Sequence, residues 1–241
     1  MKIRIKRQRP DGQPYWQEFL YQPVAHENVA QVLDTLNYRD DLYDIEGKKA
    51  PHIAWECSCQ QKQCGACAMV ICGNPSLACA TFPEELPIKN DTLIVEPLSK
   101  FPVIEDLRVD RSILYENLKA SELWLTDPAR VDSDRYATNY DAAKCLKCGL
   151  CLEVCPNYLK GTTFFGPAMI PETYLSVMQG KKDGLHFHKN VAAGCSKSGA
   201  CQKVCPMQMD TLGMFATLSG RHVLSKKIHK ADAGKEAESP L

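Results

Sequence analysis

The sequence predicts an α+β fold in which a strand-rich N-terminal domain is followed by a helical C-terminal domain. Three observations support this: apolar alternation with period two near the N-terminus, one amphipathic helical segment among the strands, and helical periodicity after about residue 105. We expect domain limits of 1–104 and 105–225. A polar tail at 226–241, rich in Lys, Ala, Glu, Ser and Gly, is expected to be mobile.

The order of elements in the N-terminal domain is typical of a β-grasp. Ile3 and Ile5 alternate with basic residues, which indicates a half-buried strand. A turn signal at 9–12 precedes an aromatic-rich segment at 15–21, which is expected to return as the hairpin partner. Apolar residues with helical spacing predict a short helix over 27–37. The later strands are expected at 68–72 and 93–95.

Composition limits the classes of partner. Of the 241 residues, 29 are basic and 29 are acidic, so no strongly basic surface calls for nucleic acid. The N-terminus shows no secretory signal, and the longest uncharged run, at 63–83, is broken by Gly and Pro and is not a membrane span. Any membrane attachment is therefore expected through a partner. The 13 cysteines cluster at short metal-type spacings, which favours reduced ligands over disulfides and a cytosolic compartment.

The C-terminal domain is organised around the run C-x2-C-x2-C-x3-C-P at 145–156. This is the spacing of bacterial ferredoxins. Three thiolates on a tight loop each reach one corner of a cubane cluster. The fourth lies one helical turn further on and ligates the other cluster of a two-cluster protein. The run therefore predicts a second cluster in an α-helical ferredoxin domain.

The second run, at 195–206, has cysteines at ligand positions one, three and four and Ser198 at position two. With the fourth ligands exchanged, the 4Fe–4S cluster is assigned to Cys145, Cys148, Cys151 and Cys205, and the other cluster to Cys155, Cys195 and Cys201. Because the second set has only three thiolates, we predict a 3Fe–4S cluster. Ligation by the Ser198 oxygen, or by water at a fourth iron, is the alternative.

A third motif, C-x4-C-x2-C…C, lies in the N-terminal domain and has the plant-type 2Fe–2S spacing. Its ligands are Cys59, Cys64, Cys67 and Cys79. Gly65 and Ala66 are small, which suits a backbone that approaches a cluster. Cys57 is an alternative to Cys59, although only Cys59 gives the x4 gap. Cys72 falls in the predicted strand at 68–72 and is interpreted as a small buried apolar residue.

This combination of motifs resembles the iron–sulfur subunit of succinate dehydrogenase and fumarate reductase. The resemblance covers nearly the whole chain and is carried by the three cysteine motifs, by Leu77-Ala78-Cys79, by the segment 102–110 and by Phe165-Gly166-Pro167-Ala168. It implies a flavoprotein partner with FAD and the dicarboxylate site. It also implies a membrane anchor, often with haem b, which forms a quinone site. This chain would then conduct electrons in respiration from the 2Fe–2S cluster through 4Fe–4S to 3Fe–4S, peripherally on the cytoplasmic side of the membrane.

The departures from the family pattern bear on the acceptor. Ubiquinone-type members usually carry tryptophans after the proline at 156 and a histidine after the first cysteine of the second run. Here residues 157–160 are Asn-Tyr-Leu-Lys and the histidine is replaced by Ser196. Both changes favour menaquinone and fumarate reduction. By the resemblance, Pro156, Tyr158 and Ser196 are expected near the quinone head group.

Two alternatives remain at this stage. One is a subunit of a soluble, thiol-linked fumarate reductase, which keeps the clusters but not the quinone. The other is an interaction module without redox activity in which the cysteines hold structural zinc. In no case does the sequence nominate a catalytic acid or base in this chain.

Overall fold

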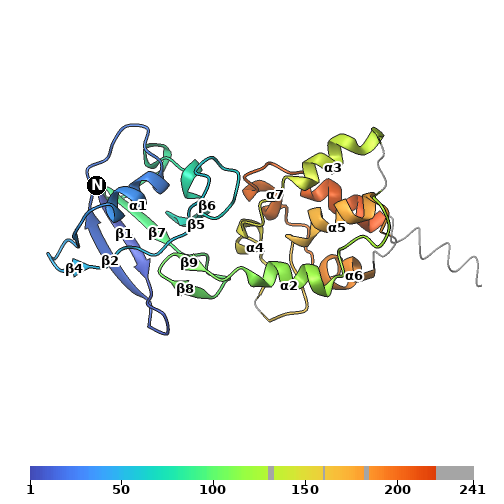
Figure 1. Cartoon of the computed structure of the whole chain (residues 1–241), viewed down its shortest axis with the longest axis horizontal. Helices are drawn as coiled ribbons and strands as arrows, with labels where there is room; N and C mark the ends of the chain where they lie inside the picture. The colour runs from blue at the N-terminus through green and yellow to red at the C-terminus, as the bar shows by residue number, and fades with distance from the viewer. Residues whose placement is uncertain (130–132, 160, 182–184, 221–241) are drawn as a thin grey trace, which may run out of the picture. The chain divides into compact units, whose positions relative to one another are not determined.

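The computed structural model describes residues 1–129, 133–159, 161–181 and 185–220, so the predicted tail at 226–241 lies outside the described residues (Figure 1). The chain forms two compact units that interleave along the sequence. Unit 1 comprises 1–114, 146–154 and 204–207, and unit 2 comprises the described residues of 115–145, 155–203 and 208–220. Unit 1 therefore combines the N-terminal part of the chain with two short cysteine-bearing segments.

A mixed five-stranded sheet forms the centre of unit 1 (Figure 1). Its order is β2-β1-β7-β5-β6, with β1 (Lys2–Arg7), β2 (Tyr15–Leu20), β5 (Ala68–Ile71), β6 (Asn74–Leu77) and β7 (Thr92–Glu96). Alternate residues of β1 are buried, and β1 pairs antiparallel with β2 and parallel with β7. A bond from the Gly12 N–H to the Arg9 carbonyl, 2.9 Å, closes the predicted turn. The predicted strand–hairpin arrangement is confirmed.

The predicted helix is α1 (Val29–Asn37), whose buried face consists of aliphatic residues. Asn28 and Gln31 form a capping box, which satisfies backbone N–H groups at the start of the helix. The smaller elements of unit 1 are β3 (Leu42–Tyr43), β4 (Lys49–Ala50), η1 (Ala78–Ala80), η2 (Pro83–Glu85), β8 (Val103–Glu105), β9 (Arg108–Val109) and α4 (Leu150–Glu153). The segment after 98 contains the β8–β9 hairpin.

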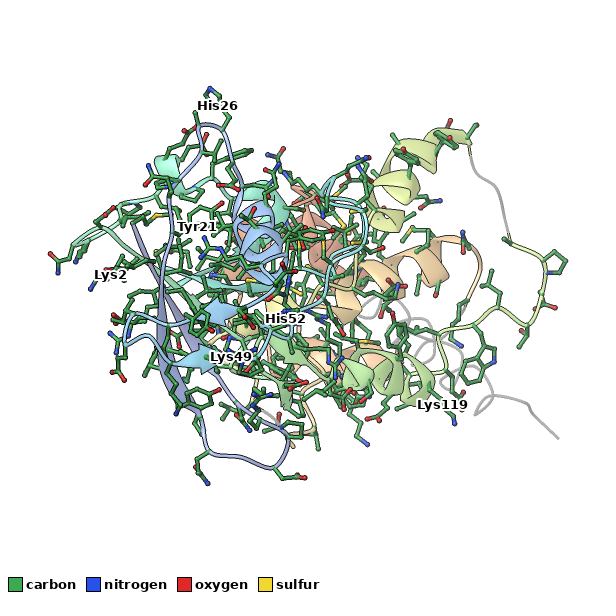
Figure 2. All side chains as sticks on the ribbon, turned by 60° about the vertical axis from the view of Figure 1, so that its left-hand side comes forward. Lys2, Tyr21, His26, Lys49, His52 and Lys119 are labelled. Carbon is green, nitrogen blue, oxygen red and sulfur yellow. The ribbon has the colours of Figure 1, made fainter. Side chains whose placement is uncertain are left out.

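Arg7 lies on the buried face of β1 with Ile3 and Ile5, although its side chain is charged. It is fully buried, and its guanidinium lies 2.7 Å from the Asp106 carboxylate, which is also fully buried. The guanidinium also donates to the carbonyl oxygens of Pro51 (3.0 Å) and His52 (2.8 Å); His52 is labelled in Figure 2. Asp106 accepts the Ala54 N–H at 3.0 Å. This buried pair joins β1 to the β8–β9 hairpin.

The prediction that Cys72 lies in a strand is wrong. β5 ends at Ile71, and Cys72 and Gly73 form the two-residue turn to β6 with φ of 47° and 79°. Two consecutive positive φ angles match the twist of a tight hairpin. The Cys72 side chain is half-buried in this turn and is not a core residue. β6 itself, which includes Pro75, is an edge strand, where a proline is tolerated.

Unit 2 is helical, as predicted. Its elements are η3 (Ser133–Arg135), α3 (Tyr136–Ala143), α5 (Met169–Met178), α6 (Leu185–Phe187), the π-helical turn η4 (His188–Ala192), α7 (Ala200–Val204) and a helix over 211–220. α2 (Ser112–Ala120) spans the point where the chain passes from unit 1 to unit 2. The Phe187 and Phe215 rings pack with centroids 5.6 Å apart. None of the described helices has the length and apolar composition needed to cross a bilayer.

Candidate iron–sulfur sites

The predicted 2Fe–2S ligands lie on one loop of unit 1 and on η1. The Cys59 sulfur accepts the N–H groups of Gln61 (3.3 Å) and Gln63 (3.2 Å), and these bonds lower the pKa of the Cys59 thiol to about 7. Burial raises the pKa of the Cys67 thiol to about 12. Cys59 contacts Cys64, and Cys67 contacts Cys79. The four cysteines thus meet in two pairs, one with backbone N–H donors and one in the interior.

Cys57 is a fifth thiol at this site. Burial and the charge of Asp34 raise its pKa, whereas a bond from Gln60 lowers it. The Cys57 thiol also interacts electrostatically with the thiols of Cys64 and Cys79. The structure therefore keeps Cys57 close to the four predicted ligands, and the choice between Cys57 and Cys59 stays open.

Arg111 binds the backbone of the cysteine loop. Its guanidinium donates to the carbonyl oxygens of Ala66 (3.1 Å) and Ala68 (3.3 Å), the residues on either side of Cys67. It also forms an ion pair with Glu56 at 2.8 Å. No spacing rule points to Arg111, because it lies far from the cysteine motif in sequence.

The first ferredoxin run enters unit 1 directly beside the 2Fe–2S loop. Gly65 has φ of +74°, and a Cβ built on it would lie 2.7 Å from the Cβ of Cys148 and 3.0 Å from that of Leu146. Glycine is therefore required at this position by backbone conformation and by the close approach of the second cysteine loop. From the sequence, a small residue was expected at Gly65 only because the backbone approaches the cluster there.

Helix α4, which follows Cys148, is anchored within unit 1 by its last residue. The Glu153 carboxylate accepts the Ser99 hydroxyl at 2.6 Å and the Ser99 and Lys100 N–H groups, both at 3.1 Å. Cys148, Cys151 and Cys205 all belong to unit 1, whereas Cys145 precedes the segment that begins at 146. Cys205, the fourth cysteine of the second run, is thus in the same unit as Cys148 and Cys151 of the first run.

The three remaining predicted ligands lie together in unit 2. Cys155, Cys195 and Cys201 line one cavity, and Cys195 and Cys155 are electrostatic neighbours of Cys201. The Cys195 sulfur accepts the Lys197 N–H at 3.4 Å. Ser198, whose side chain is exposed, lines the same cavity. The apolar part of the lining comes from Phe164, Pro167, Ile170, Val191, Leu212 and Phe215.

Of the predicted quinone residues, Ser196 belongs to the lining of this cavity, whereas Pro156 and Tyr158 follow the lining residue Cys155 in the sequence. Asn157 donates to the Gly194 carbonyl at 2.6 Å, which fixes the chain after Cys155 against the start of the second run. Ser196 lines the cavity and is exposed, whereas Tyr158 is buried, and burial raises the pKa of its hydroxyl. Neither Asn157 nor its bond was signalled by the sequence.

Comparisons with known proteins match both halves of the chain. Residues 2–116 match the family model "2Fe-2S iron-sulfur cluster binding domain", and residues 141–209 match "4Fe-4S dicluster domain". The succinate dehydrogenase iron–sulfur subunit of Bacillus subtilis is 32% identical over 183 residues, which cover 72% of this chain and 70% of that protein. This chain belongs to the succinate dehydrogenase and fumarate reductase iron–sulfur subunit family.

Further relatives agree with this membership. The fumarate reductase iron–sulfur subunit of Escherichia coli O157:H7 is 29% identical over 178 residues, covering 70% of this chain and 69% of that one. A chain of the Mycobacterium smegmatis Sdh1 complex in the apo form has the same fold, with a TM-score of 0.70, 22% identity, and coverage of 91% of this chain and 95% of that one. The expected α+β fold and family are thereby confirmed.

As a member of this family, the chain is an electron-transfer subunit with a 2Fe–2S domain and a 4Fe–4S dicluster domain. None of its 13 cysteines, all within the described residues, forms a disulfide. Among the described residues, no group of three or more His, Cys, Asp or Glu side chains converges enough to hold a single metal ion.

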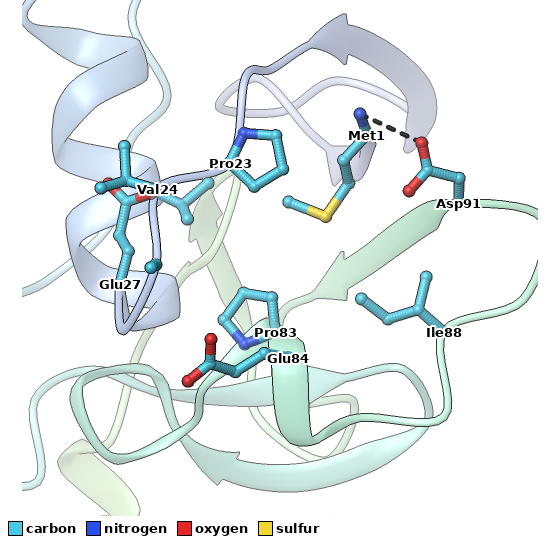
Figure 3. Close-up of a pocket in the computed structure, with 10 residues that line it drawn as sticks. Met1, Pro23, Val24, Glu27, Pro83, Glu84, Ile88 and Asp91 are labelled. Atoms are coloured by element: carbon cyan, nitrogen blue, oxygen red, sulfur yellow. Dashed lines mark ion pairs between the residues drawn. The ribbon is translucent and has the colours of Figure 1, made fainter.

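An open pocket elsewhere in unit 1 has no cysteine in its lining (Figure 3). Its volume is about 310 Å³. Pro23, Val24, Pro83 and Ile88 line it, and the N-terminal amine of Met1 forms an ion pair with Asp91 at 3.1 Å on its margin. Apolar side chains and carboxylates are not the thiolate ligands of an iron–sulfur cluster, so this pocket is separate from the predicted sites.

Proposed function

We propose that this subunit carries single electrons between a flavoprotein partner and a membrane quinone. The flavoprotein would hold FAD and the succinate or fumarate site, and an anchor subunit of the cytochrome b type would hold the quinone, which we assign as menaquinone. The chain would sit peripherally on the cytoplasmic face of the membrane. Support comes from its relatives, which are named as iron–sulfur subunits of succinate dehydrogenase and of fumarate reductase.

We assign three clusters to the ligand sets deduced from the spacing. They are 2Fe–2S with Cys59, Cys64, Cys67 and Cys79, 4Fe–4S with Cys145, Cys148, Cys151 and Cys205, and 3Fe–4S with Cys155, Cys195 and Cys201. The observation that carries the proposal is the distribution of the fourth cysteines. Cys205 shares unit 1 with Cys148 and Cys151, and Cys155 shares a cavity of unit 2 with Cys195 and Cys201. This supports the exchange of fourth ligands.

Each cluster, when bound, supplies a one-electron site whose potential depends on cluster type, charge, hydrogen bonds and exposure. The residues of this chain position the clusters, insulate them from solvent and tune their reduction potentials. The contact between Gly65 and Cys148 lets two ligand loops approach without an intervening side chain. The N–H donors to Cys59 and Cys195 stabilise thiolates. No side chain is assigned proton transfer to or from substrate.

The quinone site is proposed beside the cavity of unit 2, with Pro156, Tyr158 and Ser196 as its residues. Support comes from the Asn157–Gly194 bond, which holds 155–158 against the start of the second run. In the assembled complex, Ser196→Leu is expected to slow quinone-dependent turnover while the cluster signals remain. Unchanged turnover with quinone would exclude Ser196 from the site.

The experiment that tests the cluster assignment uses Ser198 in the complete chain purified without oxygen. The oxidised protein should contain iron and acid-labile sulfide and give the nearly isotropic EPR signal of a 3Fe–4S cluster. Ser198→Cys supplies the missing fourth thiolate. The oxidised variant should lose the isotropic signal, and the reduced variant should gain the EPR signal of an additional reduced 4Fe–4S cluster. Ser198→Ala is the matched control and should leave the 3Fe–4S signal intact, since the proposal gives Ser198 no ligand role.

Two results would overturn the proposal. Zinc without sulfide in the purified protein would remove the electron-transfer role. Absence of the isotropic signal from the unmodified protein, together with its appearance in Ser198→Ala, would mean that the serine oxygen holds a fourth iron, and the third cluster would not be 3Fe–4S.

A further inference from the structure

A buried hydroxyl lies against one of the three thiols in the cavity of unit 2. The Thr211 Oγ1 is 3.6 Å from the Cys201 Sγ, a distance suited to a hydrogen bond involving sulfur. Thr211 is 3% exposed and Cys201 is 9% exposed, so water competes little for either group. Neither cysteine motif includes residue 211. The contact is therefore a product of tertiary packing.

Two further side chains fix Thr211 in this place. The Gln202 side-chain oxygen accepts the Leu212 N–H at 3.0 Å, which ties the residue after Cys201 to the residue after Thr211. Asp210 accepts the Gly213 N–H at 3.0 Å, as an N-cap residue does at the start of a helix. The start of the helix over 211–220 is thus held against α7, and the hydroxyl has little freedom to leave the sulfur.

The chemistry of the ligand decides the direction of this bond. A thiol can donate or accept, but a cysteine that ligates iron is a thiolate and can only accept. The hydroxyl must then be the donor. Because the O–H group points its hydrogen at the thiolate, the hydroxyl stabilises negative charge on this sulfur.

We propose that Thr211 tunes the third centre by donating a hydrogen bond to the thiolate of Cys201 and thereby raising the reduction potential of the cluster. The inference rests on the proposed function, because it needs a cluster on Cys155, Cys195 and Cys201. Reduction adds one electron to the centre and makes or breaks no bond to the protein. A donor to a ligand sulfur stabilises the more negative, reduced state. Thr211 is thus a positioning and tuning residue.

The test is a redox titration of the complete, cluster-loaded chain. The EPR signal of the oxidised third centre is the readout. Thr211→Val removes the hydroxyl and keeps the shape. At a fixed ambient potential, the ratio of reduced to oxidised centre should fall about tenfold, which is a midpoint about 59 mV lower for one electron. Thr211→Ser keeps a hydroxyl and should restore most of the shift. An unchanged midpoint in Thr211→Val, with the signal intact, would overturn the inference.

The matched control is Thr217→Val on the same helix. The Thr217 hydroxyl donates to the Gly213 carbonyl at 3.0 Å and is exposed, so its loss should leave the midpoint unchanged. Should Thr211→Val fail to hold the centre, Thr211→Ala gives the same reading without a methyl group against the cavity. If Thr211→Val and Thr211→Ala both lose the third cluster while Thr211→Ser keeps it, Thr211 has a structural role, and the proposal that it tunes the reduction potential is overturned. Absence of the third signal from the unmodified protein would instead overturn the proposed function.

Discussion

The predicted 2Fe–2S site of unit 1 and the predicted three-cysteine site of unit 2 are built in different ways. The first takes its ligands from one segment, 59–79, on a β-grasp scaffold, and its two cysteine pairs differ in surroundings. Backbone N–H groups stabilise the Cys59 thiolate, and the interior disfavours that of Cys67. The second takes its ligands from two distant runs and adds a side-chain hydroxyl at Cys201.

This difference shows how a protein can set the properties of a cluster with different groups. In unit 1 the loop itself supplies the N–H donors, so ligand spacing and tuning come from the same stretch of sequence. In unit 2 the donor on Cys201 comes from a helix that follows the second run, and the cavity wall is largely apolar. The first site is therefore sensitive to loop conformation, and the second to packing of the helix over 211–220.

The largest expected effect is loss of one cluster alone. Cys79→Ala removes a buried ligand from η1 and should abolish the 2Fe–2S signal in EPR of the reduced protein while the isotropic signal of the third centre remains. Cys72→Ala, in the β5–β6 turn, is the matched control and should keep every signal. Loss of both signals in Cys79→Ala would show that the two sites are not independent.

A smaller effect is expected from breaking the buried ion pair of unit 1. Asp106→Asn leaves the Arg7 guanidinium buried without its counter-charge, which should cost about 3–5 kcal/mol of unfolding free energy. In a urea titration in which release of each cluster is monitored, the variant should lose its 2Fe–2S cluster at a lower urea concentration than the unmodified protein does.

The matched control for Asp106 lies in unit 2. Asp141→Asn removes the partly exposed pair with Lys144, 3.0 Å apart, and should cost only about 0–1 kcal/mol. If the two substitutions lowered the unfolding free energy by the same amount, burial would not account for the strength of the Arg7–Asp106 pair.

The smallest effect concerns pH in the folded, cluster-free protein. Because the pKa of Cys59 is lowered to about 7, its thiolate forms as the pH rises through 7, whereas Cys201, whose pKa is raised by burial, stays protonated there. Iodoacetamide should therefore modify Cys59 several-fold faster than Cys201 at pH 7.5, as read by peptide mass spectrometry. In denatured protein the two rates should converge. A Cys59 rate that rises only above pH 9 would contradict the role of the Gln61 and Gln63 N–H groups.

Much of the architecture was predictable because its signals are local. Alternation in 3–5, the turn at 9–12 and the helical spacing in 27–37 each reflect one element burying one face, and each is confirmed. The error at Cys72 has a local cause as well. A tight hairpin needs two positive φ angles, and a cysteine gives little sign of adopting one.

The amino-acid sequence alone determined the family, the order of the two folds and the eleven predicted cluster ligands, because an inorganic cluster imposes fixed spacings on the thiolates that hold it. Only the tertiary structure decided which groups distant in sequence meet, both at those thiolates and elsewhere in the core. Arg7 opposite Asp106, Gly65 against Cys148 and Thr211 on Cys201 are partners distant in sequence. Such contacts gain their energy from burial that exists only after folding, so no spacing rule announces them.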